Sequence, residues 1–151
     1  MKKLLGIMTA LLPISGLAPA ETGNGLIGKK SHHSVKKTWI GWHKRCANKG
    51  FTTVLRWRHD ASAENAGLSL RPTELLLFSK PKVGTHLMTG QQIAGIDLPM
   101  KMLVWKDAAG QAWLSYNDPV YIARRHGITD RDKNIATMSK APDNFSRLAA
   151  E

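Results

Sequence analysis

The order of the patterns along the chain predicts an α+β fold, a single domain in which a mostly antiparallel sheet has helices packed on one face. Three observations lead to this fold class. Apolar residues recur with helical spacing after Ser34, whereas residues 51–58 alternate between two sides as a half-buried strand does. Residues 102–105 and 112–116 flank a short loop in which Gly110 comes late, which is typical of an antiparallel hairpin. Helix signals return after this hairpin.

The chain opens with a Gly-rich flexible entry at residues 21–33, which includes a possible first strand over residues 26–32. Ser34 suits a helix N-cap because its hydroxyl accepts a hydrogen bond from a free backbone N–H of the first turn. The helix that follows ends at Gly50, which readily adopts the left-handed conformation. Its apolar face consists of residues four, three and four positions apart, namely Val35, Trp39, Trp42 and Cys46.

Shorter elements fill the middle of the chain. After the strand at residues 51–58, residues 61–67 favour a helical turn. The apolar run at residues 74–78 lies between two prolines and predicts a central strand. Thr85 is a candidate cap for a short helix that extends to about Ile93.

The C-terminal third favours helices. Asp118 followed by Pro119 is a helix start, since an acid caps the free N–H groups and proline is tolerated at the first helical position. This helix ends at Gly127. A last helical section is expected over residues 130–150, interrupted near Pro142 and capped again one residue later.

Residues 1–20 have the layout of a signal peptide. Lys2 and Lys3 precede an apolar run, and Ala18 and Ala20 supply the small residues expected before the cleavage point. The run is too short and wrongly flanked for a stable membrane span. The sequence therefore predicts a periplasmic or secreted protein that begins at Glu21 and has no transmembrane segment after cleavage.

The charge of the exported chain is strongly basic. The sequence has 22 Lys and Arg and 11 Asp and Glu residues, and removal of Lys2 and Lys3 leaves a net charge of +9. Because export separates the protein from the chromosome, nucleic acid is not an expected partner, and an anionic envelope component is a more plausible one. The favoured alternative is a basic surface that gives solubility and only nonspecific attraction to polyanions. The basic side of the first helix is the candidate surface, formed by Lys36, Lys37, Lys44 and Arg45.

The single cysteine, Cys46, cannot form a disulfide within the chain, so stability must come from an apolar core. Its place on the apolar side of the first helix favours a buried, inert thiol.

Several short motifs follow one another in the second half of the chain. They are Arg71-Pro72-Thr73-Glu74, Pro81-Lys82-Val83-Gly84-Thr85, and the run from Trp113 to Pro119. Together they resemble the bacterial family called domain of unknown function 302, over roughly residues 34–127 of a single domain at 34–150. This resemblance implies a TATA-binding-protein-like fold, with a curved antiparallel sheet and helices behind it. It implies no particular chemistry.

The chain departs from the family pattern at two places. Ser79-Lys80 stands where the family usually has Gly-Asn, and Arg58 precedes His59 where members commonly carry Asp. A ligand held by that turn or that acid in other members would not find the same groups here.

Metal, cofactor and nucleophile signals are weak. No Cys-x-x-Cys, His-x-x-x-His or Gly-x-Ser-x-Gly pattern occurs, so we expect no metal and no cofactor. The histidines are scattered along the chain, at His32, His33, His43, His59, His86 and His126.

Two residues are candidates for acid/base catalysis. Glu74 opens an apolar strand, where partial burial would favour its protonated form, and His59 ends the preceding strand. If they converge at one edge of the sheet they form a minimal acid/base pair. The alternative is a structural ion pair of Glu74 with Arg71 or Lys101.

The candidate binding residues are polar groups near the ends of predicted elements, namely Lys82, Thr85, Asp97, Tyr116 and Asn117. The preferred interpretation is a non-catalytic binding or accessory module of the bacterial envelope, expected to be a homodimer and to bind a small ligand or an anionic envelope component. Two alternatives stay open: an enzyme of unassigned class that uses His59 and Glu74, and a polyanion binder that uses the basic helix face.

Overall fold

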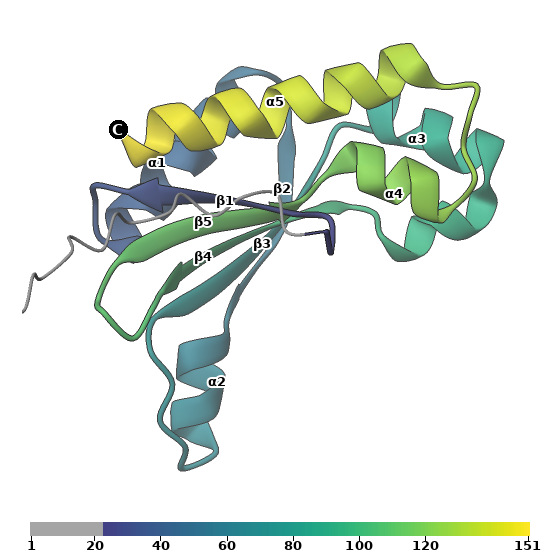
Figure 1. Ribbon diagram of the computed structural model, residues 1–151. Helices are drawn as coiled ribbons and strands as arrows, with labels where there is room; N and C mark the ends of the chain where they lie inside the picture. Colours follow the sequence, from purple (N-terminus) through teal and green to yellow (C-terminus); the bar gives the residue numbers. More distant parts are fainter. Residues whose placement is uncertain (1–22) are drawn as a thin grey trace, which may run out of the picture.

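The centre of the protein is a five-stranded sheet in which all neighbouring strands are antiparallel (Figure 1). This is seen in a computed structural model that describes residues 23–151; the expected signal peptide at residues 1–20 lies outside them. The spatial order is β1-β5-β4-β3-β2. The strands are β1 (Leu26–Ser31), β2 (Thr52–Arg58), β3 (Thr73–Ser79), β4 (Met100–Lys106) and β5 (Ala112–Asn117).

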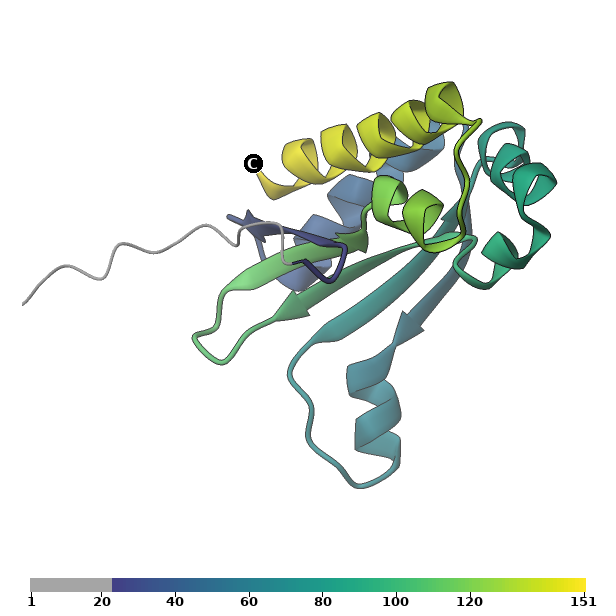
Figure 2. The same ribbon diagram turned by 45° about the vertical axis from the view of Figure 1, so that its right-hand side comes forward.

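Most helices lie on one side of this sheet (Figures 1 and 2). Helices α1 and α5 pack against each other on this side of the sheet, and the shorter helices α3, η1 and α4 lie near one end of it. Helix α2 instead projects from the opposite end. The bounds are α1 (Val35–Asn48), α2 (His59–Asn65), α3 (Pro81–Gly90), η1 (Gln92–Ile96), α4 (Pro119–Arg125) and α5 (Asp132–Ala150). The predicted α+β single domain is therefore confirmed.

The core lies between the sheet and helices α1 and α5. Alternate residues of the three inner strands point into it, as the two-residue period of a strand requires. Trp42 is fully buried and meets the ring of Phe78 edge-on, with ring centroids 4.6 Å apart. Phe145 of α5 approaches Trp42 from above, at 6.5 Å. Each such large side chain stabilises the fold by about 1.5–3 kcal/mol through burial.

Several helices and strands begin or end where the local sequence predicts. The Ser34 hydroxyl accepts a hydrogen bond from the Lys37 N–H at the start of α1, and the Asp118 carboxylate accepts one from the Val120 N–H at the start of α4. Gly50 follows the end of α1 with a φ of 71°. The predicted hairpin is formed by β4 and β5.

The prediction that residues 51–58 form a half-buried strand is wrong in its burial. Strand β2 is the edge of the sheet, and its residues 54–58 are all exposed. A bulge between Thr53 and Leu55 shifts the register against β3. The alternating pattern arises because one side faces Trp39 of α1 and the other side faces open solvent, not because either side is deeply covered.

Two helix boundaries also differ from the prediction. Helix α3 begins at Pro81 with Lys80 as its N-cap, so Thr85 lies inside the helix and does not cap it. Proline at the first helical position costs nothing because its missing N–H would have had no partner there. Helix α5 runs through Pro142 without interruption, because the proline ring is buried against the core and packing compensates for one lost hydrogen bond.

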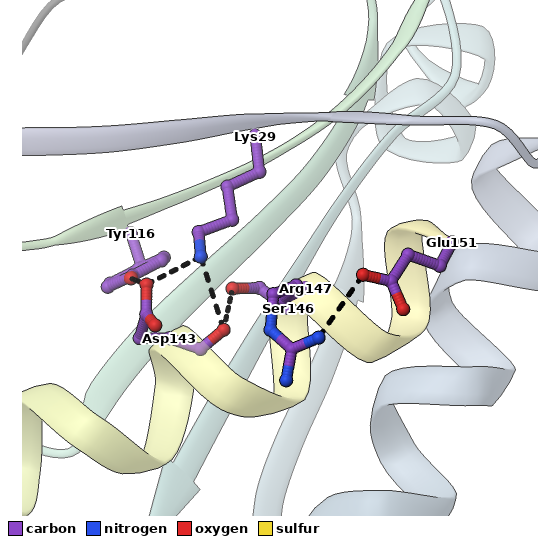
Figure 3. A network of polar contacts seen from close by, with 6 residues as sticks. All are labelled: Lys29, Tyr116, Asp143, Ser146, Arg147 and Glu151. Carbon is purple, nitrogen blue, oxygen red and sulfur yellow. Dashed lines mark hydrogen bonds and ion pairs between the residues drawn. The ribbon is translucent and has the colours of Figure 1, made fainter.

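Helix α5 is tied to the sheet by a polar network around Asp143 (Figure 3). The Lys29 ammonium on β1 donates to both the carboxylate and the main-chain carbonyl of Asp143. The Tyr116 hydroxyl on β5 donates to the same carboxylate at 3.4 Å, and the Ser146 hydroxyl donates to the Asp143 carbonyl at 3.0 Å. The C-terminal segment thus packs on the domain. Across residues 23–151, none of the helices has the length and apolar character needed to cross a bilayer.

Candidate functional site

The main candidate site is an apolar cavity of about 290 Å³ at the end of the sheet where β3 leads into α3. It is open to solvent on one side and collects residues from five parts of the chain. Its walls are mostly apolar, formed by Phe51, Phe78, Pro81, Val83, Met88, Leu98, Pro99, Met100 and Met138. Ser79, Lys80, Gly84 and Thr85 complete the lining. Methionine side chains adapt to irregular shapes, so three of them in one wall suit a ligand of variable outline.

Lys80 supplies the charge at this cavity. Its ammonium donates a hydrogen bond to the Lys49 carbonyl at 3.0 Å and lies 5.2 Å from the centre of the Phe51 ring. No carboxylate within residues 23–151 forms an ion pair with it. A cation that has no carboxylate partner among the described residues and lies beside an apolar cavity can attract an anionic group on a bound molecule.

Gly84 is the feature of α3 that keeps the cavity open. It lies in the wall, and a Cβ added there would have the Leu98 side chain as its nearest neighbour, at 4.0 Å. A larger side chain at this helical position would therefore enter the cavity without disturbing the backbone.

The predicted binding residues lie in different places around this cavity. Thr85 is part of the lining, whereas Lys82 is exposed on α3 outside it. Asp97 lies immediately before the lining residues Leu98 and Pro99, which are joined by a cis peptide bond.

The Asp97 carboxylate is already occupied by two cationic or polar partners. It accepts a hydrogen bond from the Arg125 guanidinium at 3.3 Å, and its second oxygen lies 2.6 Å from His126 Nε2. The His126 side chain is nearly fully buried. This cluster joins the end of η1 to the end of α4, and so fixes the segment that carries Leu98 and Pro99.

Tyr116 and Asn117 are not part of the cavity lining. The Tyr116 ring is buried in the core, and its burial raises the pKa of the phenol well above the usual range. Asn117 pairs with Leu26 at the end of β5. The structure therefore does not bring Tyr116 and Asn117 together with Thr85.

The buried Glu74 forms an ion pair with the partly exposed Arg56, in place of the Arg71 or Lys101 pairing considered from the sequence. The Arg56 guanidinium reaches the Glu74 carboxylate at 2.6 and 2.8 Å and lies over the Trp39 ring, 4.1 Å from its centre. The pair thus connects β3, β2 and α1. Both contacts are made to Oε2 of the carboxylate, so its charge is balanced by the guanidinium.

His59 begins α2 at the far end of β2. In the part of the chain that the structure describes, no hydrogen bond or ion pair joins it to Glu74. The neighbouring Arg58 and Asp60 pair with each other at 2.8 Å, which lowers the pKa of the Asp60 carboxyl. The geometry of His59 and Glu74 does not form the acid/base pair considered from the sequence.

Metal-ligand clusters are absent from residues 23–151: no three His, Cys, Asp or Glu side chains lie close enough to hold an ion. On the basic side of α1, Lys36, Lys37 and Lys44 are exposed, and Arg45 is half-buried against the Gly41 carbonyl.

Comparison with known proteins places this geometry in a family. Residues 27–145, most of the chain, match the family described as "Domain of unknown function DUF302". The chain belongs to the DUF302 family. A solved structure from this family, an uncharacterized conserved protein from Bacillus stearothermophilus, superimposes with a TM-score of 0.76 at 13% identity and covers 84% of this chain and 98% of that one. This likeness supports the fold.

Curated relatives of this DUF302 chain include proteins named "Fluoride-specific ion channel". FluC 1 of Brucella suis and FluC 1 of Brucella abortus are each 40% identical to it over 128 residues. The match covers 84% of this chain but 50% and 47% of those proteins. The chain thus spans about half the length of the curated relatives it matches.

Sequence reasoning missed most of the cavity of this DUF302 domain. Phe51, Met88 and Met138 lie on three separate segments, and only the folded chain brings them together. His126 was counted among scattered histidines, yet it contacts Asp97, 29 positions earlier. One sequence feature does point to the cavity. Lys80 places a positive charge between the end of an apolar strand and Pro81, where the next helix begins.

Proposed function

We propose that the protein is a non-catalytic binding module of the bacterial envelope, and that its cavity takes a small apolar molecule with one anionic group. The observation that carries this proposal is the apolar cavity of about 290 Å³ with Lys80 in its lining, whose ammonium donates to the Lys49 carbonyl and forms no ion pair within residues 23–151. This volume is near the lower end of ligand pockets, which suits a short-chain or single-ring acid.

The ion pair of Glu74 supports the non-catalytic part of this proposal. Its carboxylate is held by Arg56 away from the cavity, so neither it nor His59 would reach a molecule bound there. The Thr85 hydroxyl is the polar group best placed to add a hydrogen bond to the ligand.

Octanoate and its uncharged counterpart octanamide test the proposal by isothermal titration calorimetry. We expect octanoate to bind about tenfold more tightly, since one hydrogen bond to a charged group is worth about 1.5–3 kcal/mol. In Lys80→Met this preference should disappear while octanamide binding is retained. Equal binding of both probes by the unmodified protein would contradict the role of Lys80.

A matched pair of variants tests the cavity itself. Gly84→Leu should fill it and abolish binding, whereas Gly84→Ala should retain binding. Both replacements should leave the fold intact or stabilise it, because glycine in a helix interior costs about 1 kcal/mol relative to alanine. Undiminished binding in Gly84→Leu would show that the ligand does not bind in this cavity. Native mass spectrometry of the protein purified from its own cells would then identify any natural ligand.

A second candidate function is an accessory module that works beside a fluoride channel. It is favoured by the 40% identity to about half of the Brucella channels, combined with the lack of a membrane-spanning helix in residues 23–151. If the matched half of those channels has this fold, their membrane-spanning part must lie in the other half.

A chimera tests this second candidate. The matched half of the Brucella suis channel is deleted, or replaced by residues 23–151 of this chain, and fluoride efflux is measured from proteoliposomes. We expect the deletion to reduce or deregulate efflux and the replacement to restore it. Unchanged efflux after the deletion would remove this candidate and leave the cavity proposal untouched.

A further inference from the structure

On the side of the sheet opposite most helices, here called the open face, no helix of residues 23–151 lies across the strands (Figures 1 and 2). Strand register places these residues on one side: Leu55 lies opposite Leu77, and Trp105 lies opposite Trp113. The apolar members of the open face are Leu55, Trp57, Leu75, Leu77, Leu103, Trp105 and Trp113. Trp57, for example, has 48% of its surface exposed to solvent.

The two tryptophans on the central strands have no unpaired polar atoms. Trp105 donates its indole N–H to the Ser115 hydroxyl at 2.9 Å, and Trp113 donates to the Asp107 carboxylate at 2.8 Å. Their rings stack with centroids 6.2 Å apart. Both indole N–H groups already have acceptors within the chain. Covering the open face would therefore remove apolar surface from water without breaking these hydrogen bonds, which is favourable.

A second unpartnered apolar surface lies on the segment from His59 to Pro72, here called the arm, which comprises α2 and the loop after it. Figure 2 shows α2 extending beyond the end of β2 and β3, away from the other helices. None of the α2 residues is buried, and in the loop Leu68 and Leu70 are 68% and 47% exposed. Exposed leucines on a segment with no fully buried helical residue are candidates for burial against another molecule.

The charges of the two surfaces are complementary. The arm carries two acidic residues, Asp60 and Glu64, and one basic residue, Arg71, in a chain that is otherwise strongly basic. Asp60 pairs with Arg58 on β2, whereas Glu64 forms no ion pair within residues 23–151. The open face has Lys101 opposite Leu77, and the Lys30 ammonium lies over the Trp113 ring at 5.4 Å. The Glu64 carboxylate of one copy is therefore attracted by the basic, apolar open face of another.

We propose that the open face binds a second copy of this chain, with the arm of each copy lying across the open face of the other. A two-fold axis makes this exchange reciprocal and closes the assembly at two chains. Leu68 and Leu70 of one copy then cover the tryptophans of its partner. A standard interface buries about 800 Å² on each partner, and three tryptophans and six leucines, each partly exposed, offer a surface of that order.

Sedimentation velocity on the unmodified protein and four variants tests this. The wild type should sediment as a dimer, and the arm variant Leu68→Glu/Leu70→Glu and the face variant Leu103→Glu should sediment as monomers with unchanged circular dichroism. The matched control is Ile93→Glu/Ile96→Glu, because both isoleucines are 70% exposed on η1, outside the arm and the open face. The control should stay dimeric. Glu64→Lys should raise the dimer dissociation constant several-fold.

Three results would overturn the proposal. One is a wild type that is monomeric at every concentration, and another is an arm variant that still dimerises. The third is binding of the monomer to phosphatidylglycerol vesicles with a blue shift of tryptophan emission that Trp57→Ser weakens. That result would assign the open face to a membrane surface.

Discussion

The carboxylate of Asp97 lies 2.6 Å from His126 Nε2, and this contact connects the segment after η1 to the end of α4. Both side chains are close to fully buried, so neither can satisfy its hydrogen bonds with water if the other is removed. The next two residues along the chain, Leu98 and Pro99, line the cavity. A contact that looks like half of a catalytic dyad therefore serves, in this geometry, to position one wall of a binding site.

Removal of this carboxylate should destabilise the domain markedly. We expect Asp97→Ala to lower the free energy of unfolding by about 1.5–3 kcal/mol, because His126 loses its charged partner in a buried place. Arg125→Ala should cost less than about 1 kcal/mol, since this guanidinium is 54% exposed and its ion pair is screened by water. Urea unfolding followed by tryptophan fluorescence measures both. Similar losses of unfolding free energy in the two variants would show that the buried His126 contact contributes no more to stability than the exposed Arg125 ion pair.

The Glu74–Arg56 pair should be structural and energetically coupled. Glu74→Gln and Arg56→Gln should each reduce stability, and a double-mutant cycle should give a coupling of about 0.5–3 kcal/mol between them. The exposed pair of Arg147 with Glu151 is the matched control, where we expect a coupling below about 0.5 kcal/mol. Octanoate binding should be unchanged in Glu74→Gln. If that variant lost binding without losing stability, Glu74 would belong to the site after all.

Features set by neighbouring residues could be predicted from the sequence, whereas features set by distant segments could not. The Asp118 cap and the β4–β5 hairpin depend on residues within one or two turns of each other, and both were predicted. The exposure of β2 depends on its place at the sheet edge, which an alternating pattern does not encode. Thr85 was assigned to a cap on residue preference alone, although Pro81 marks the true helix start.

The same reasoning applies to the candidate site. Its cavity requires Phe51 after α1, Met88 on α3 and Met138 on α5 to meet, and no local pattern links these three positions. Apolar residues that line a cavity have the same spacing as residues that fill a core, so periodicity does not separate them. Polar residues favoured Tyr116 and Asn117 in the sequence prediction, yet the Tyr116 hydroxyl contacts Asp143 of α5 and Asn117 pairs with Leu26 at the end of β5.

The network around Asp143 should contribute modestly to the attachment of α5. We expect Asp143→Ala to cost about 1 kcal/mol, because the buried Tyr116 hydroxyl loses its acceptor while Lys29 remains partly hydrated. Tyr116→Phe should cost less, since a hydrogen bond of 3.4 Å is long and weak. Thermal unfolding of the two variants beside the wild type measures the difference. A larger loss in Tyr116→Phe would mean that the hydroxyl has a stronger role than this geometry gives it.

Cys46 should resist modification for as long as the protein is folded. Its thiol is fully buried on α1, and burial raises the pKa to about 12 from a usual value of 9.0, so the reactive thiolate is almost absent in the native state at neutral pH. A thiol reagent such as DTNB should react only as fast as the domain unfolds. Ile93→Cys, at an exposed position, should react at once in the same sample and serves as the control.

The raised pKa of Cys46 also predicts a pH dependence of stability. Below about pH 9 the thiol is protonated in both states and has no effect on folding. Between about pH 9 and 12 the unfolded chain releases this proton while the native chain retains it, so stability should fall as the pH rises. The buried Tyr116 phenol acts in the same direction, because its pKa is also raised. Urea unfolding of Cys46→Ala should therefore show a weaker loss of stability above pH 9 than the wild type, and an equal loss in both would contradict the assignment to Cys46.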